Sequence, residues 1–341
     1  MPKVLMADGH NGLCFVDTPS CPLQPWQVRV SVTCTLVSPG TELHYLDVAM
    51  RTGSRYPLGY CAAGRVTEVG VKAGDLRPGD RVIAMGWGAA VHADEVVVPR
   101  LLCCRLPDHV TFDDAVIANL AATAVHALDR GGVREGDEVT VIGAGIVGQL
   151  LAQAARARTS GAVTVVDVSD ERLATVRATA VRTIQGAEFI ESGYETSSAT
   201  RCAFVCVSGD ATAAMGAALS WVAAGKFRGR VVAVGRFAAS IDFSADLGNV
   251  DIRVASRCGA GYRDDEYLSG QRGVAVPPGE ATVDHNLARA LDLVASGVLG
   301  RRHMAIPVAA FTEAVSVYDR LRTDRSIVSV ILRYEPVNGS P

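Results

Sequence analysis

The sequence has 341 residues, 49% of them hydrophobic, and this length exceeds what a single hydrophobic core usually supports. Its 33 basic and 36 acidic residues give a net charge of -3 with no basic block, which excludes an electrostatic footprint for nucleic acid. No apolar stretch is long enough to cross a membrane, and the first residues lack the pattern of a secretory signal. We therefore expect a cytoplasmic protein of two domains that acts on a small molecule.

The first third of the chain is predicted to be mostly β-structure. Apolar and polar residues alternate over 27–34, and further short strands are expected at 63–69, 80–84 and 95–98, separated by Gly and Pro. The run Arg77-Pro78-Gly79-Asp80 has the composition of a tight turn with a structural role.

From residue 111 the pattern changes to alternating helices and strands. Thr111 and Asp114 have the spacing of a capping box before an apolar helical run over 115–128, which Gly131 and Gly132 end. The strand and helix patterns that follow predict a parallel, doubly wound sheet.

After the last apolar strand of this region, at 252–255, the chain is rich in Gly and Pro up to residue 279. A helix is then expected over 286–296 and a strand over 327–332. We assign this last part to the first domain.

The segment from Gly143 to Gly148 fits the dinucleotide-binding pattern G-x-G-x-x-G and lies between a predicted strand and a predicted helix. Gly143 permits a tight turn, Gly145 lets the backbone approach a pyrophosphate, and Gly148 allows the helix to pack on the strand. Amides at the start of the helix, where Ile146 and Val147 lie, would hold the phosphates.

Asp167 ends the next predicted strand, about 20 residues beyond the last glycine, where a carboxylate that binds ribose is expected. Its charge would repel a 2'-phosphate and no cation follows immediately, so the sequence favours NAD over NADP. Rossmann folds place their ligand at the carboxyl ends of strands. Two more such ends are therefore expected to line the cofactor groove, and they carry Ser208, Gly209, Gly235 and Arg236.

Three further stretches carry a resemblance to the medium-chain dehydrogenase/reductase superfamily. They are Ser38-Pro39-Gly40-Thr41-Glu42-Leu43-His44, Tyr56-Pro57-Leu58-Gly59-Tyr60 and Gly79-Asp80-Arg81-Val82. The resemblance implies an α/β fold in which a GroES-like, mostly-β catalytic domain is interrupted by a Rossmann domain with a doubly wound parallel sheet. We place residues 1–118 and 260–341 in the catalytic domain and residues 119–259 in the Rossmann domain.

The first two stretches are most similar to a zinc-free branch that includes bacteriochlorophyllide a dehydrogenase-like oxidoreductases. In zinc alcohol dehydrogenases of the superfamily, the three ligands of the catalytic metal stand at positions that correspond to Pro39, Tyr60 and Asn119 here. None of these positions keeps a ligand, whereas a tetrahedral zinc needs three or four convergent thiolate, imidazole or carboxylate groups. We therefore predict no metal.

A zinc site rebuilt from Cys61, His44 and His92 is the alternative. Without zinc, side chains must stabilise the alkoxide that forms when an alcohol is oxidised. The resemblance implies that Thr41 contacts the substrate oxygen and that His44 passes its proton outward.

Tyr60, at a ligand position, would donate to the oxyanion, or act as an acid or base if its pKa were lowered. The simpler alternatives are that His44 caps a turn, that Tyr60 packs beneath the cofactor and that Glu42 pairs with a cation. Further candidates for substrate contact are Glu42, His92 and Asn119.

The leading hypothesis is a zinc-independent oxidoreductase that transfers a hydride between NAD(H) and a secondary alcohol or ketone, such as a polyol, cyclitol or sugar-like intermediate. One alternative is an enoyl or quinone reductase of the same superfamily, which would use NADPH, and Asp167 and His44 argue against it. Another is a dinucleotide-binding protein without catalysis, which the retained Thr41 and His44 disfavour. The resemblance also implies a homodimer paired through an edge of the Rossmann sheet, for which the apolar strand near Ile252 is the candidate.

Overall fold

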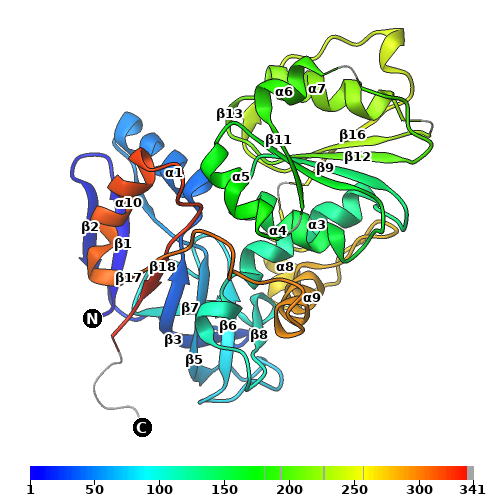
Figure 1. The fold of residues 1–341 in the computed structure, drawn as a ribbon. Coiled ribbons are helices and arrows are strands. Elements are labelled where there is room, and N and C mark those ends of the chain that lie inside the picture. Colours follow the sequence, from blue (N-terminus) through cyan, green and yellow to red (C-terminus); the bar gives the residue numbers. More distant parts are fainter. Residues whose placement is uncertain (180, 193, 226, 256, 336–341) are drawn as a thin grey trace.

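The computed structural model describes residues 1–335 apart from 180, 193, 226 and 256. Figure 1 shows two lobes: an antiparallel β lobe that contains the first and last strands, and an α/β lobe formed by the middle of the chain. This arrangement confirms the predicted fold class. None of the helices in these residues is long and apolar enough to span a bilayer.

The β lobe is built on a sheet with the strand order β17-β18-β3-β5-β6-β8, with β7 paired to β3, and on a smaller sheet with the order β2-β1-β4. The alternation predicted for the first long strand is present, because Val28, Val30 and Val32 all point into the core. The terminal strand is shorter than predicted. The strands of this lobe are β1 (Lys3–Asp8), β2 (Gly12–Asp17), β3 (Gln27–Leu36), β4 (Arg55–Pro57), β5 (Cys61–Val69), β6 (Arg81–Met85), β7 (Glu95–Pro99), β8 (Cys103–Arg105), β17 (Val308–Ala310) and β18 (Ile331–Arg333).

A helix absent from the sequence prediction, α1 (Pro39–Thr52), directly follows β3 and carries the Thr41 to His44 segment. Ser38 stands before its first residue, and the Glu42 carboxylate accepts a hydrogen bond from the Ser38 amide at 2.6 Å. The helix ends at Gly53, which adopts a left-handed conformation with φ of 69°. A proline at the start and a glycine just past the end are typical of helices, so the sequence did contain this signal.

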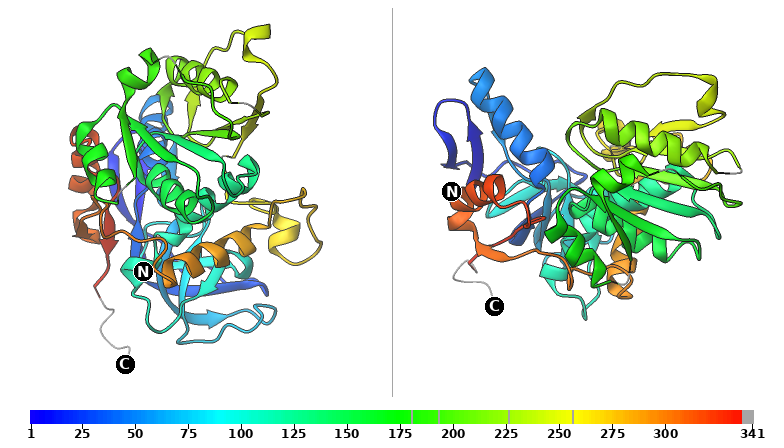
Figure 2. Two further views of the ribbon diagram at one scale, coloured as in Figure 1. Left: turned by 45° about the vertical axis from the view of Figure 1, so that its right-hand side comes forward. Right: turned by 45° about the horizontal axis from the view of Figure 1, so that its top comes forward.

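The α/β lobe has a fully parallel sheet in the order β11-β10-β9-β12-β14-β16, which is the strand order of dinucleotide-binding domains. Successive side chains of its strands enter two separate cores, so helices cover both faces of the sheet (Figure 2). Its main elements are β9 (Glu138–Ile142), α4 (Ile146–Arg156), β10 (Val163–Asp167), α5 (Asp170–Arg177), β11 (Arg182–Gln185), α6 (Gly186–Glu191), β12 (Arg201–Val205), α7 (Thr212–Ala223), β14 (Arg230–Ala233) and β16 (Asp251–Val254).

Between the lobes the predicted helix is split into α2 (Phe112–Ala115) and α3 (Ala118–Gly131). The Thr111 side chain accepts from the Asp114 amide, as its spacing predicted, and Gly132 ends α3 in a left-handed conformation. Helix α9 (Val283–Ala295) packs on α3, which also contacts β5, β6 and β14. Since α3 contacts both lobes, its contacts do not assign it to one domain. The domain limits at 118/119 and 259/260 therefore remain predictions.

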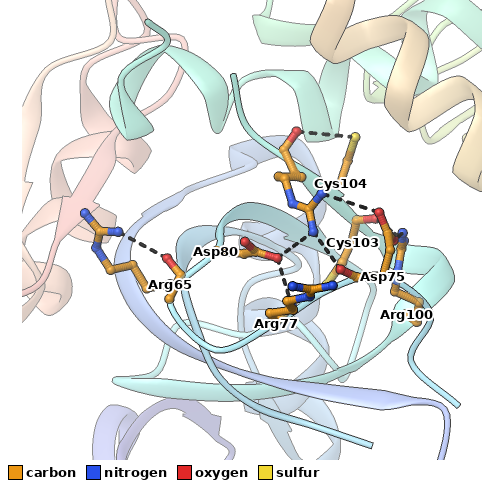
Figure 3. A network of polar contacts seen from close by, with 9 residues as sticks. Arg65, Asp75, Arg77, Asp80, Arg100, Cys103 and Cys104 are labelled. Atoms are coloured by element: carbon orange, nitrogen blue, oxygen red, sulfur yellow. Dashed lines mark hydrogen bonds and ion pairs between the residues drawn. The ribbon is translucent and has the colours of Figure 1, made fainter. Parts of the chain in front are cut away.

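The predicted turn before β6 lies in a network of ion pairs (Figure 3). The Asp80 carboxylate accepts from the Arg77 amide at 2.8 Å and from Arg105 at 2.7 Å, and Asp75 also binds Arg105. Gly79 has φ of 92°, which suits glycine. These contacts hold the turn against β8 and confirm its structural role.

Candidate functional site

The glycine turn follows β9 and leads into α4. Gly143 has φ of 107°, and a Cβ atom on Gly148 would lie 1.8 Å from the Gly143 oxygen, so side chains are excluded at both positions. A Cβ on Gly145 would meet nothing within 4 Å. The start of α4, with Ile146 and Val147, thus lies beside open space, and its first amides are predicted to hold a pyrophosphate there.

Asp167 ends β10 beside this turn and is buried. Its Oδ2 accepts a hydrogen bond from the Ala144 amide at 2.6 Å, and its Oδ1 accepts from the Ser169 amide at 2.8 Å. Each carboxylate oxygen keeps a further lone pair for a ribose hydroxyl. The two amides therefore hold the Asp167 carboxylate beside the glycine turn, where a carboxylate that binds ribose is expected.

The predicted cofactor residues of the other strands lie at the same edge of the sheet. Ser208 and Gly209 follow β12, Gly235 and Arg236 follow β14, and Gly209 pairs with Phe237 in a short parallel ladder. A Cβ on Gly235 would lie 2.0 Å from the Val207 oxygen, so the two loops pack closely. The structure thus brings all four predicted residues to the carboxyl end of the sheet.

Tyr60 extends from the turn between β4 and β5. Gly59 has φ of 93° and a Cβ there would lie 2.6 Å from the His92 amide, so only glycine fits before Tyr60. The Tyr60 hydroxyl donates to Ser38 Oγ at 2.7 Å. Burial raises the pKa of Tyr60 well above its ordinary value, and hydrogen bonds with Ser38 and Thr41 offset this only in part. Tyr60 therefore stays protonated at neutral pH, which suits a hydrogen-bond donor and not a base.

His44 lies on α1 and meets the α/β lobe. Its Nε2 is 3.0 Å from Nη1 of Arg236, and since a guanidinium can only donate, Nε2 accepts this bond. Burial, followed by the positive charge of Arg236, lowers the pKa of His44. The imidazole is therefore neutral near pH 7, and it joins the β lobe to the sheet edge that carries the predicted cofactor residues.

Aromatic side chains connect these polar groups. The Arg236 guanidinium lies 5.6 Å from the centre of the Tyr45 ring, which packs on Trp87 with ring centres 4.2 Å apart. Trp87 in turn lies 5.9 Å from the Tyr60 ring, and its amide donates to the Tyr262 hydroxyl. Neither Tyr45 nor Trp87 is among the site residues predicted from the sequence. Tyr45 could have been found once α1 was recognised, whereas no local signal marks Trp87.

Glu42 and His92, proposed as substrate contacts, are instead fully buried. Glu42 accepts hydrogen bonds from His92 Nε2 at 2.8 Å and from the Tyr318 hydroxyl, and His92 Nδ1 contacts Thr35 Oγ1 at 2.7 Å. With every polar atom of the imidazole engaged, the pair forms an interior network. A substrate contact is therefore not supported for either residue.

Asn119 is also fully buried, on the first turn of α3. Its Nδ2 donates to the Ala62 oxygen at 3.2 Å, while its Oδ1 has no hydrogen-bond partner in the structure. A substrate contact of this atom stays a prediction.

The residues at hand do not fit a catalytic zinc. The family ligand positions hold a proline, a protonated tyrosine and an amide, namely Pro39, Tyr60 and Asn119. The rebuilt set does not form either, because His92 is engaged at both nitrogens, His44 faces a cation, and burial holds the Cys61 thiol protonated by raising its pKa. Among the described residues no three His, Cys, Asp or Glu side chains gather as a metal site.

Known proteins similar to this chain are dehydrogenases. Human sorbitol dehydrogenase is 32% identical over 167 residues, which are 39% of this chain and 46% of that protein, so the matched part spans about half the length of the relative. No family model matches the chain. Alcohol dehydrogenase TADH from Thermus sp. ATN1 superposes with a TM-score of 0.76 at 20% identity, covering 98% of this chain and 100% of that one.

A putative zinc-binding dehydrogenase from Sinorhizobium meliloti 1021, solved with NADP, has a TM-score of 0.77 at 17% identity, covering 98% of this chain and 99% of that one. Together these matches support the medium-chain dehydrogenase/reductase superfamily. A dinucleotide cofactor for this chain stays a prediction. Membership of this superfamily and of its zinc-free branch stays a prediction.

Proposed function

We propose that the protein is a zinc-independent, NAD-dependent dehydrogenase that interconverts a secondary alcohol and a ketone. The observation that carries this proposal is the contact between His44 of the β lobe and Arg236 of the α/β lobe. It brings the residue at the family proton-relay position to the sheet edge that holds the glycine turn and Asp167. The proposed proton relay would then lie next to the proposed dinucleotide site.

The residues fit a bound NAD, which would supply the hydride acceptor. The turn from Gly143 to Gly148 would hold its pyrophosphate, and Asp167 would accept from the adenosine ribose hydroxyls. The carboxylate favours NAD over NADP, because it would repel a 2'-phosphate.

Proton transfer and oxyanion stabilisation fall to residues of α1 and the turn before β5. The Tyr60 phenol is protonated and can turn its one O–H from Ser38 to the alkoxide oxygen that forms when the substrate hydroxyl loses its proton. Thr41 lies beside Tyr60 and three residues before His44, on the same side of the helix. It can hand the hydroxyl proton to the neutral imidazole, whose Nε2 accepts the proton once Arg236 no longer donates to that nitrogen and then releases it outward.

A polyol, cyclitol or sugar-like intermediate is the substrate class we favour. The Tyr45 and Trp87 rings, tilted by 34° to each other, offer an aromatic wall against which the C–H groups of such molecules can pack. The similarity to sorbitol dehydrogenase supports the same class. We also propose a homodimer and a cytoplasmic location, as predicted from the sequence.

The test is a series on purified protein: NADH and NADPH binding, metal content, and NADH formation over a panel of polyols, cyclitols and simple secondary alcohols. We expect tighter binding of NADH, less than stoichiometric zinc, and turnover that a strong chelator does not reduce. Stoichiometric zinc with activity lost on chelation would overturn zinc independence. NADPH oxidation with enones or quinones, and none with alcohols, would support the reductase alternative, and binding without any turnover the non-catalytic one.

A further inference from the structure

Arg236 is an exposed arginine with no carboxylate partner at the candidate site. In the part of the chain that the structure describes, it donates to His44 and lies over Tyr45, but it forms no ion pair. Arg201, by contrast, pairs with the Glu138 carboxylate at 2.9 Å. A planar guanidinium without such a partner presents a fork that matches carboxylate and phosphate oxygens.

The charges around Arg236 add to its positive potential. Arg51 is the other cation that acts on His44, and the nearby acidic group is Asp47. The Asp47 carboxylate is already paired with Arg322 at 2.5 Å, so it does not neutralise Arg236. The surface beside His44 is therefore cationic and would attract an anion.

The aromatic wall runs from this cation to the oxyanion donor. Tyr45 lies under Arg236, Trp87 packs on Tyr45, and Tyr60 adjoins Trp87. A substrate lying along the wall would have its reacting carbon near Tyr60 and its far end at Arg236. The guanidinium is thus placed to bind the end of the substrate opposite its reacting carbon.

We propose that the substrate carries an anionic group, a carboxylate or a phosphate monoester, which pairs with Arg236 while its body packs against Tyr45 and Trp87. This inference rests on the proposed dehydrogenase function. The carboxylate and the phosphate present the same oxyanion chemistry, and the test separates the two.

The test compares three matched substrates: a neutral polyol, its terminal phosphate monoester and the corresponding aldonate. Wild-type protein is expected to prefer one of the anionic substrates in kcat/KM, and this preference identifies the anion. In Arg236→Met the ratio of anionic to neutral kcat/KM is expected to fall about 10- to 100-fold, the range for losing a charged hydrogen bond. Effects that pass through His44 act on all three substrates and cancel in the ratio.

Arg51→Met is the matched control, because it removes an equal charge near His44 without touching the wall. Its ratio is expected to stay close to wild type. A ratio that Arg236→Met leaves unchanged would overturn the proposal, and so would an equal fall in both variants. Weaker NADH binding in Arg236→Met with an unchanged ratio would assign Arg236 to the cofactor instead.

A failure of the proposed function is distinguishable from a failure of this inference. If no alcohol is oxidised, calorimetric titration with inorganic phosphate and with benzoate still reports on the anion site. Binding that Arg236→Met abolishes and Arg51→Met retains would support the anion site without dehydrogenase activity. Absence of binding in wild-type protein would overturn it.

Discussion

Burial shifts the pKa values of the Tyr60 and His44 side chains in opposite directions. Burial raises the pKa of the phenol, and burial together with the Arg236 charge lowers that of the imidazole. Both side chains are consequently neutral near pH 7. In the mechanism that we propose, the phenol donates a hydrogen bond to the alkoxide and the imidazole accepts the proton.

Replacing Tyr60 by Phe removes the proposed oxyanion donor and leaves the ring against Trp87. We expect kcat to fall about 10²- to 10³-fold, the usual effect of losing such a donor, with NADH affinity retained. Stopped-flow turnover and NADH titration measure the two quantities. Tyr56→Phe is the control, since its ring contacts Tyr45 and lies outside the relay. Unchanged turnover in Tyr60→Phe would remove this residue from the mechanism.

The pH dependence of kcat/KM for a neutral alcohol should report on His44. The neutral imidazole accepts the proton, so activity is present above the pKa and is lost as the pH falls through it. Because that pKa is lowered, the acidic limb should lie below pH 6.5. Arg236→Met removes a positive neighbour and should move the limb to higher pH. A limb that stays in place or moves down would contradict this assignment.

At the scale of elements, α1 depends on a carboxylate inside the β lobe. Glu42 accepts from the Ser38 amide, His92 and Tyr318, and these contacts tie the start of the helix to β3, to the loop before β7 and to α10 (Ala314–Thr323). The network fixes the turn that presents Thr41 and His44. A buried, fully bonded carboxylate is the kind of group whose loss is costly.

Glu42→Gln replaces one accepting oxygen by an amide that faces donors. We expect the free energy of unfolding to fall by about 1–3 kcal/mol, measured by urea denaturation. Glu191→Gln, an exposed change at the end of α6, serves as control and should have little effect. An equally stable Glu42→Gln protein would show that the network does not hold the helix.

The edge strand β16 leaves Ile252 and Val254 exposed, at 39% and 59%. Unpaired strand edges with apolar side chains invite pairing with a second chain. If the proposed homodimer forms there, Val254→Lys should convert it to monomer in analytical ultracentrifugation. Val71→Lys, at an exposed loop position of the other lobe, should not. A Val254→Lys protein that remains dimeric would exclude this edge as the interface.

At the scale of the whole molecule, cofactor binding should stabilise the folded chain. A ligand at about 100 times its Kd adds roughly 2.7 kcal/mol to the free energy of unfolding. NADH should therefore raise Tm more than NADPH at equal concentration, because Asp167 repels a 2'-phosphate. Asp167→Asn should narrow this difference. Equal shifts with both cofactors in wild-type protein would contradict the predicted preference for NAD.

The sequence alone determined the architecture of the α/β lobe. The glycine turn, Asp167 and the alternation of strands and helices are local patterns, because they depend on backbone conformation and on periodic burial within short segments. They predicted a parallel sheet in which these residues meet, and the structure has it. The helix α1 was predictable by the same means from its proline and glycine.

Only the tertiary structure decided which side chains of the β lobe lie at the candidate site and which lie in the interior. The contact of His44 with Arg236 joins residues 192 positions apart, and that of Glu42 with Tyr318 joins residues 276 apart. Whether Glu42 faces substrate or the interior depends on which distant segments cover it, and no local pattern encodes that. Long-range packing therefore buried Glu42 and His92 and left Arg236 exposed beside His44.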